Sequence, residues 1–472
     1  MNLKKTLSII LLLLIAGFTF AQTPLPKTEI KLKEIGKMKT RKASKIKSSD
    51  LGIGCEVLDR DFASYDAYKG YLGELGVKHA RFQSGWAKTE KQKGVYDFRW
   101  LDVVLDDCLS KSIQPWVCIC YGNPLYPDGG SEQSSSVLPI AGEALEGWLA
   151  YVAKLVNQYK SKVFEWEVWN ESDHRNFRGA TAEDYAVFYL KTAKVIRSIQ
   201  PQAKIVVGGM CSSGVTDYIC TVFDYMKNQG EIKMIDGITF HGYPNNPDAT
   251  FKENLELVSY VKQFGNHIVA RQGETGAPST RGTSGALSNT DFTELSQAKW
   301  DLRRALGTIG NKIPFSLFTL SEFNYPGNKL NTKGKLKINE DLSIAHVKQS
   351  YFGYQFLTAL FDSELTAMER KDDLIPSDNK SSLYVFRDSQ TKTKLLAYWD
   401  SSDKPGESLS VTNATINLNG YKFKTPVLVD IRTGIVYEVP KSSIKGGFVE
   451  LPVYDSPLFI CDKILLTKKK LL

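Results

Sequence analysis

The sequence predicts a (β/α)8 barrel followed by a small β-sandwich. Two patterns along its 472 residues support this prediction. Between residues 51 and 321, short apolar runs rich in β-branched residues alternate with longer segments of helical period, as parallel strands joined by crossover helices do. From about residue 370, short strand-like runs follow one another without helices between them. A closed barrel with an antiparallel domain after it accounts for both patterns.

Eight apolar runs make up the predicted barrel, and about 300 residues suit eight strand–helix units. The segment Thr181–Ile199 illustrates the helices between the runs, because Thr181 and Asp184 form an N-terminal capping pair and apolar residues then recur at helical spacing. The predicted barrel strands are Leu51–Val57, Lys78–Ser84, Gln114–Tyr121, Val163–Glu171, Lys204–Met210, Gly237–Tyr243, His267–Glu274 and Pro314–Leu320.

The same patterns set the expected domain limits. The barrel is expected over residues 49–365, the sandwich over 366–467 and a basic tail over 468–472. Turns rich in Gly, Pro, Asn and Ser separate the strands of the sandwich. These predicted strands are Ser382–Arg387, Lys394–Trp399, Ser408–Asn417, Pro426–Asp430, Ile435–Val439 and Phe448–Leu451.

The first 21 residues are typical of a secretory signal peptide. Lys4 and Lys5 precede an apolar run, and Thr19-Phe20-Ala21 resembles a cleavage site. The run is shorter than the ~20 residues of a membrane-spanning helix, so we expect export without stable membrane insertion after signal removal. The protein would then be periplasmic, on the cell surface or extracellular. Residues 22–48 form either a disordered leader or a strand of the sandwich.

The charge distribution argues against a nucleic-acid partner. The net charge is +8, but residues 27–47 hold nine Lys or Arg and two Glu, and five more lysines lie at positions 4, 5 and 468–470. Residues 48–467 are therefore left with a formal charge of −4. A mildly acidic body does not predict a phosphate-binding surface, and the P-loop pattern is absent from the sequence.

Cysteine and histidine usage points to neither disulfides nor a metal. Seven cysteines are spread from Cys55 to Cys461, which is unlike the dense framework of a small disulfide-rich domain, so most are expected to be buried thiols. The five histidines show no spacing typical of metal ligands. We therefore predict no metal site and no cofactor.

Two glutamates end predicted strands at the place where such a barrel carries its chemistry. Reactive side chains come from the carboxyl ends of the strands; Glu171 ends the fourth run and Glu274 the seventh, roughly opposite each other in an eight-stranded ring. Two carboxyl groups about 5–5.5 Å apart can cleave a glycosidic bond with retention, one attacking the anomeric carbon while the other protonates the departing oxygen. The acid should have a raised pKa, and the nucleophile should stay ionised among hydrogen-bond donors.

The side chains next to these glutamates could supply the donors. Asn170 precedes Glu171, and His241 and Tyr243 end the sixth run. We expect all three to donate hydrogen bonds and to hold the sugar, with simple packing as the alternative for His241 and Tyr243.

These residues resemble glycoside hydrolase clan A. The resemblance lies in Trp169-Asn170-Glu171, in His241-x-Tyr243 and in Glu274; the stretch from Arg81 to Trp86 is closest to family 39. It covers about residues 50–365. Clan membership implies a barrel, a retaining mechanism, Glu171 as the acid/base and Glu274 as the nucleophile.

Four further residues receive provisional roles. Arg81 is expected to pair with Glu167 inside the barrel and to donate a hydrogen bond to the nucleophile. Trp86 and Trp169 could stack on sugar faces, although a place in the core is the alternative for each. Glu322 in Ser321-Glu322-Phe323 would take the nucleophile role if the strand count were short by one.

The function predicted from the sequence is an exported retaining hydrolase of β-type glycosidic bonds in oligo- or polysaccharides. One alternative is a catalytically silent carbohydrate-binding protein, which would be expected to lack one of the two carboxylates. Another is a transglycosylase with the same residues. The expected partner is a carbohydrate substrate; sugar, linkage and oligomeric state are not specified by the sequence.

Overall fold

The computed structural model describes residues 25–133, 136–174, 180–327, 329–369 and 380–472. The predicted signal peptide lies outside these residues. Among the described residues, no helix combines the length and the apolar character that a bilayer crossing requires.

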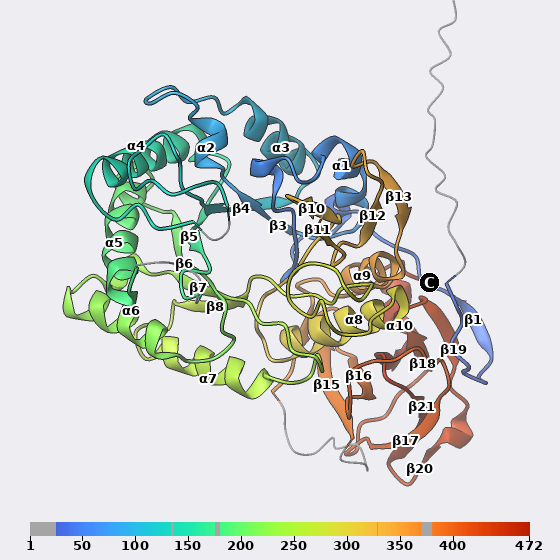
Figure 1. Cartoon of the computed structure of the whole chain (residues 1–472). Coiled ribbons are helices and arrows are strands. Elements are labelled where there is room, and N and C mark those ends of the chain that lie inside the picture. Colours follow the sequence, from blue (N-terminus) through green and yellow to red (C-terminus); the bar gives the residue numbers. More distant parts are fainter. Residues whose placement is uncertain (1–24, 134–135, 175–179, 328, 370–379) are drawn as a thin grey trace, which may run out of the picture.

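Eight parallel strands close into a barrel, as predicted (Figure 1). The ring closes where β2 pairs with β9, Leu51 lying opposite Phe315. Each predicted run contains one strand, although the strands are mostly shorter than the runs. They are β2 Leu51–Gly54, β3 His79–Gln83, β4 Gln114–Ile119, β5 Glu165–Asn170, β6 Lys204–Met210, β7 Gly237–Phe240, β8 Val269–Gln272 and β9 Phe315–Leu317.

Helices alternate with these strands and cover the barrel. The capping pair predicted from the sequence is present at α5, where Thr181 and Asp184 exchange hydrogen bonds between side chain and backbone. The helices of the barrel domain are α1 Tyr65–Glu74, α2 Trp86–Thr89, α3 Arg99–Ser110, α4 Gly142–Tyr159, α5 Ala182–Ile199, α6 Asp217–Asn228, α7 Phe251–Lys262, α8 Glu294–Gly310 and α9 Gln349–Leu360.

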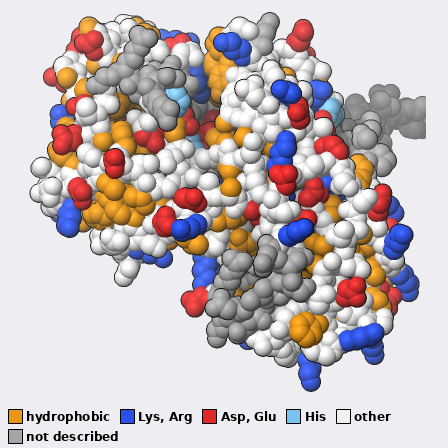
Figure 2. Space-filling view, turned by 60° about the horizontal axis from the view of Figure 1, so that its bottom comes forward, with side chains coloured by type: hydrophobic (Ala, Val, Ile, Leu, Met, Phe, Trp, Pro, Cys, Tyr) orange, Lys and Arg blue, Asp and Glu red, His pale blue; other side chains and the backbone are white. Residues whose placement is uncertain are grey.

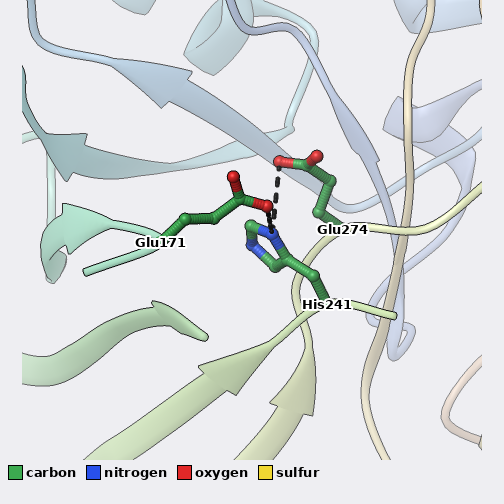
Figure 3. A group of neighbouring side chains, drawn as sticks. All are labelled: Glu171, His241 and Glu274. Carbon is green, nitrogen blue, oxygen red and sulfur yellow. Dashed lines mark hydrogen bonds and ion pairs between the residues drawn. The ribbon is translucent and has the colours of Figure 1, made fainter. Parts of the chain in front are cut away.

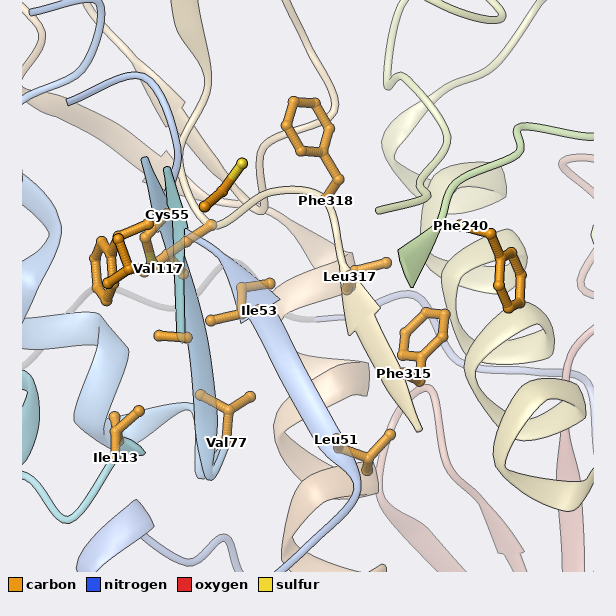
Figure 4. Close-up of a cluster of buried hydrophobic side chains, with 14 of the residues drawn as sticks. Leu51, Ile53, Cys55, Val77, Ile113, Val117, Phe240, Phe315, Leu317 and Phe318 are labelled. Atoms are coloured by element: carbon orange, nitrogen blue, oxygen red, sulfur yellow. The ribbon is translucent and has the colours of Figure 1, made fainter. Parts of the chain in front are cut away.

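A continuous apolar core fixes the strands that carry the site. Figure 4 shows Leu51 and Ile53 of β2 together with Phe315 and Leu317 of β9, all at most 1% exposed. Burial of such side chains contributes about 1.5–3 kcal/mol each. This buried core therefore fixes the positions of the strands and of their carboxyl ends.

The C-terminal domain is a sandwich of a seven-stranded and a three-stranded antiparallel sheet. It lies beside the barrel next to α8 (Figure 1). Lys299 of α8 forms an ion pair with Asp455 at 2.7 Å. The central strand β22 and the short strands β14 and β20 were not predicted. The strands are β14 Leu365–Ala367, β15 Ser381–Asp388, β16 Lys394–Asp400, β17 Thr412–Asn417, β18 Pro426–Asp430, β19 Ile435–Glu438, β20 Ile444–Lys445, β21 Phe448–Val453 and β22 Leu458–Asp462.

Both ends of the described chain are ordered against this sandwich or the barrel. Strand β1 (Glu34–Lys37) pairs with β19, so the basic leader adds a strand to the larger sheet. The expected basic tail instead continues from helix α10 (Lys463–Lys468) into Lys469, which is 5% exposed and pairs with Asp362 at 2.6 Å. The sequence showed the charge of this lysine but not its partner.

Two β-hairpins follow the barrel and were not predicted. They pair β10 (Phe323–Tyr325) with β11 (Lys329–Asn331) and β12 (Leu336–Ile338) with β13 (Ile344–Val347). The turn between them holds Lys333 beside the site described below.

The cysteines and surface charges are unremarkable in arrangement. All seven cysteines are free, five of them buried. On the face shown in Figure 2, acidic and basic side chains are interspersed rather than grouped by sign.

Candidate active site

Three predicted site residues converge at the carboxyl ends of the barrel strands (Figure 3). Glu171 follows β5, His241 follows β7 and Glu274 lies two residues after β8. One donor atom from each lies within 4.8 Å of the others. The barrel thus brings together two carboxylates that are about a hundred positions apart in the chain.

The separation of the two carboxylates fits a retaining glycosidase. Retaining enzymes hold their carboxyl groups about 5–5.5 Å apart, whereas inverting enzymes need about 6.5–9.5 Å. The Glu171 side chain is 25% exposed and the Glu274 side chain 13% exposed, so both border the opening. The same three donors could also face a cation, a grouping that the histidine spacing in the sequence did not indicate.

The backbone at the end of β5 is held in a conformation rare for residues with side chains. Trp169 and Glu171 have φ of 70° and 54°, in the left-handed region, which costs free energy and occurs mainly where structure enforces it. The neighbouring strand leaves room, because a Cβ on Gly208 would lie 2.1 Å from the Trp169 oxygen and one on Gly209 would lie 2.2 Å from His241 Nε2. The pair Gly208-Gly209 is the sequence signal of this crowding.

The nucleophile candidate Glu274 receives two strong donors. Tyr243 donates its hydroxyl proton to Oε1 at 2.5 Å, and Arg81 Nη1 donates to Oε2 at 3.0 Å. Donors of this kind favour the ionised form of a carboxyl group. Tyr243 therefore contacts the carboxylate, one of the two roles expected of it.

Arg81 organises the acidic centre of the barrel, and its five N–H groups each meet an acceptor. Two go to Glu167, at 3.0 and 2.7 Å, and one goes to Asn170 Oδ1 at 2.7 Å. Nη1 donates the remaining two, to Glu274 at 3.0 Å and to Glu56 at 3.2 Å. The expected contacts to Glu167 and Glu274 are both present, and Glu56 is an additional one.

Replacing Arg81 is expected to destabilise the fold strongly. Arg81 and Glu167 are both 0% exposed, so Arg81→Met leaves a buried carboxylate without its partner. We expect a loss of about 3–5 kcal/mol in the free energy of unfolding. Arg99→Met is the matched control, because Arg99 and its partner Asp97 are 88% and 51% exposed and a solvent-exposed pair contributes little to stability. Chemical denaturation measures both; equal losses would contradict this account.

His241 contacts Glu171 directly, and this contact lowers the pKa of Glu171, whereas a raised pKa was expected for the acid. His241 Nδ1 lies 2.9 Å from Glu171 Oε1 and 3.7 Å from Glu274 Oε2. Burial opposes a charged imidazole, but the charges of Glu274 and Glu171 outweigh it and raise the pKa of His241. Burial alone would raise the pKa of Glu171, yet the hydrogen bond from His241 outweighs it and lowers that pKa. The expectation of a raised pKa for Glu171 is therefore wrong for the free protein.

The two tryptophans proposed as sugar platforms lie in the core. Trp86 is 0% exposed, donates its indole N–H to Glu90 at 2.6 Å and stacks on Tyr126. Trp169 is also 0% exposed and packs edge to face against Trp148. Neither ring offers a face to a ligand, so the predicted sugar contact is corrected for both. Position near a strand end did not reveal on which side of the strand each ring lies.

Glu322 does not take part in the site. Barrel strand β8 precedes Glu274 and β9 ends at Leu317, so the strand count places Glu274, not Glu322, after the seventh strand. Glu322 is 1% exposed and pairs with Lys348 at 2.5 Å. Its carboxylate is thus occupied by a buried lysine.

Two charged residues near the nucleophile candidate were missed in the sequence. Glu56 follows β2 and is 3% exposed; burial raises its pKa to about 7, Arg81 opposes this rise and Glu274 adds to it. Lys333 is 1% exposed, its Nζ lies 5.3 Å from the centre of the Tyr243 ring, and burial lowers its pKa to about 8 although the charge of Glu274 opposes this. An acidic residue ending an apolar strand was the available signal for Glu56; Lys333 had none.

Comparison with known proteins finds a family resemblance over part of the chain. The sequence model described as glycosyl hydrolases family 39 matches residues 78–271, which include Glu171 and His241 and end three residues before Glu274. The comparison with curated proteins found no match.

Similar folds occur among solved structures. A family 39 glycoside hydrolase from the gut symbiont Bacteroides cellulosilyticus WH2 has a TM-score of 0.67 at 18% identity, over 89% of this chain and 82% of that one. A family 39 enzyme from Xanthomonas axonopodis pv. citri has a TM-score of 0.57 at 16% identity, over 92% and 97%. A family 39 β-xylosidase from Caulobacter crescentus has a TM-score of 0.55 at 17% identity, over 93% and 99%.

At these identities the solved structures show the fold, a barrel with an accessory β-domain. The family match is independent of them and spans the segment that carries Glu171. The predicted resemblance to family 39 is therefore confirmed over residues 78–271.

Proposed function

We propose that the protein hydrolyses β-type glycosidic bonds with retention, using Glu274 as the nucleophile and Glu171 as the acid/base. The observation that carries the proposal is the approach of the two carboxylates, whose donor atoms lie within 4.8 Å of each other. Inverting enzymes hold their carboxyl groups about 6.5–9.5 Å apart to leave room for a water molecule, so this closer approach supports retention.

In the first step, Glu274 attacks the anomeric carbon and a covalent glycosyl-enzyme forms as the leaving oxygen departs. Tyr243 and Arg81 orient the Glu274 carboxylate for this attack. Because Arg81 occupies Oδ1 of Asn170, the Nδ2 hydrogens are the ones that Asn170 can offer to a sugar hydroxyl.

The Glu171–His241 pair supplies the proton for the leaving oxygen. The negative charge of Glu274 is the largest contribution that raises the pKa of His241. When the sugar esterifies Glu274, that charge disappears, so the His241 proton becomes more acidic and passes through the ionised Glu171 carboxylate to the leaving oxygen, which leaves His241 neutral and Glu171 ionised. In the second step, Glu171 takes a proton from the attacking water, and the bond to Glu274 breaks.

Export is part of the same proposal. It rests on the signal-like segment at residues 1–21, which precedes the described residues. A polysaccharide outside the cell would be an accessible substrate for such an enzyme.

Retention is tested with a panel of aryl glycosides and polysaccharides. Aryl β-xylosides come first, because one structurally similar protein is a β-xylosidase. We expect one substrate to be cleaved and NMR during the reaction to show the product first as the β-anomer. A first product with the α-configuration would contradict the retaining assignment. Absence of cleavage together with binding of a sugar would favour the silent carbohydrate-binding alternative.

A further inference from the structure

The buried Glu56 carboxyl group shares a nitrogen of Arg81 with the nucleophile candidate. Arg81 Nη1 donates to Glu56 Oε1 at 3.2 Å and to Glu274 Oε2 at 3.0 Å. With Glu167, three carboxyl groups surround one guanidinium that is 0% exposed. Three full negative charges around one buried positive charge would be costly, so one of the groups is expected to be neutral.

The contacts of Glu56 indicate that it is the neutral group. Its Oε2 lies 3.3 Å from Thr319 Oγ1, and the single hydroxyl proton of Thr319 has a closer acceptor in the Gly54 oxygen at 2.7 Å. With its own proton directed to Gly54, the Thr319 hydroxyl can serve Glu56 as an acceptor, across 3.3 Å, when Glu56 carries the proton and donates it. Glu167 and Glu274 each accept from strong donors instead.

The strand before Glu56 is shaped to admit its carboxyl group. A Cβ on Gly54 would lie 2.2 Å from Glu56 Oε2. Gly54 does not have a positive φ, so the backbone itself does not require glycine at this position. The glycine is explained by the space that the carboxyl group occupies.

We propose that Glu56 is a positioning residue that acts on Glu274 through Arg81: as an uncharged carboxylic acid, it leaves the charge of Arg81 to the nucleophile. This inference rests on the proposed function. When Glu56 ionises, it competes with Glu274 for Arg81, so the positive charge of Arg81 stabilises the Glu274 carboxylate less. A less neutralised carboxylate is a stronger nucleophile and a poorer leaving group, so the first chemical step accelerates and the second slows.

The titration of Glu56 falls in an accessible pH range. Burial raises its pKa to about 7 against the influence of Arg81. Besides Arg81, the charged or titratable groups that interact with Glu56 are Glu274, Cys55, Tyr68 and Tyr243. Glu56 is neutral below this pKa and ionised above it, so the two steps should change in opposite directions as the pH rises through about 7.

The experiment compares wild type with Glu56→Gln, which keeps the shape and cannot ionise. The first step is followed as kcat/KM for a 2,4-dinitrophenyl glycoside, whose leaving group needs no acid; the second is followed as reactivation of the trapped 2-fluoroglycosyl-enzyme. In wild type we expect the first rate to rise and the second to fall by about three- to tenfold around pH 7. In Glu56→Gln both steps should lack this change and keep the low-pH values.

A matched control and a second variant make the outcome decisive. Glu165→Gln alters a glutamate at the other end of β5, paired with Arg271, and should behave as wild type. Thr319→Val removes the acceptor for the Glu56 proton and should move the transition to lower pH, which tests the inference even if Glu56→Gln does not fold. An unchanged transition in Glu56→Gln or in Thr319→Val overturns the inference. If wild type cleaves no glycoside, the proposed function fails instead.

Discussion

Glu274→Ala is expected to lose about 10⁴-fold or more in kcat/KM, which corresponds to more than about 5 kcal/mol of transition-state stabilisation. No other carboxylate can replace it, because it alone receives both the Tyr243 hydroxyl and Arg81 Nη1. The fold should persist, since the Glu274 side chain is partly exposed and Arg81 keeps its ion pair with Glu167. Steady-state kinetics on an activated aryl glycoside and a thermal melt measure the two quantities.

Glu322→Gln is the control for this loss. Glu322 also follows a barrel strand but is bound to Lys348. Glu322→Gln should lower the stability of the fold, while the folded protein should keep a kcat/KM close to that of wild type. If Glu322→Gln lost activity at unchanged stability while Glu274→Ala kept it, the nucleophile would have been assigned to the wrong glutamate.

Glu171→Ala should show a loss that depends on the leaving group. For an alkyl or sugar leaving group, loss of the general acid is expected to cost about 10²–10⁴-fold in kcat/KM. For a dinitrophenyl leaving group, which departs without a proton, kcat/KM should change little, while kcat falls because water is no longer activated. Kinetics over a series of aryl leaving groups measures this dependence.

His241→Asn provides the companion test. His241 Nδ1 lies 2.9 Å from Glu171 Oε1, and its hydrogen bond, together with its charge, lowers the pKa of Glu171. Without His241, Glu171 loses the neighbour that passes it the proton for the leaving oxygen, so the loss in His241→Asn should also be larger for poor leaving groups. Equal losses for good and poor leaving groups in Glu171→Ala would contradict the acid/base role.

The fold was predictable because its signals are local. Each barrel strand is an apolar run closed by a turn, and strand order in such a barrel follows chain order, so the alternation alone placed Glu171 and Glu274 at the same end. Strand β22 was missed although it lies between the predicted strands β16 and β18 in the larger sheet. The hairpins β10–β13 were missed because their strands have three or four residues each.

The details of the site depend on contacts that the sequence does not contain. The motifs located His241 and Tyr243 but not which glutamate each would bind, and the lowered pKa of Glu171 follows from that pairing. Trp86 and Trp169 were predicted as possible sugar platforms, but both rings are fully buried in the structure. Glu56 and Thr319, 263 positions apart, meet only because the barrel closes between β2 and β9.

The most direct test of the account is the anomeric configuration of the product formed when azide is added to the two alanine variants with an activated β-glycoside. In Glu274→Ala, azide should fill the space of the nucleophile and give the α-glycosyl azide. In Glu171→Ala, azide should attack the glycosyl-enzyme on Glu274 and give the β-glycosyl azide. The same anomer from both variants, or exchanged anomers, would contradict the roles assigned to these two carboxylates.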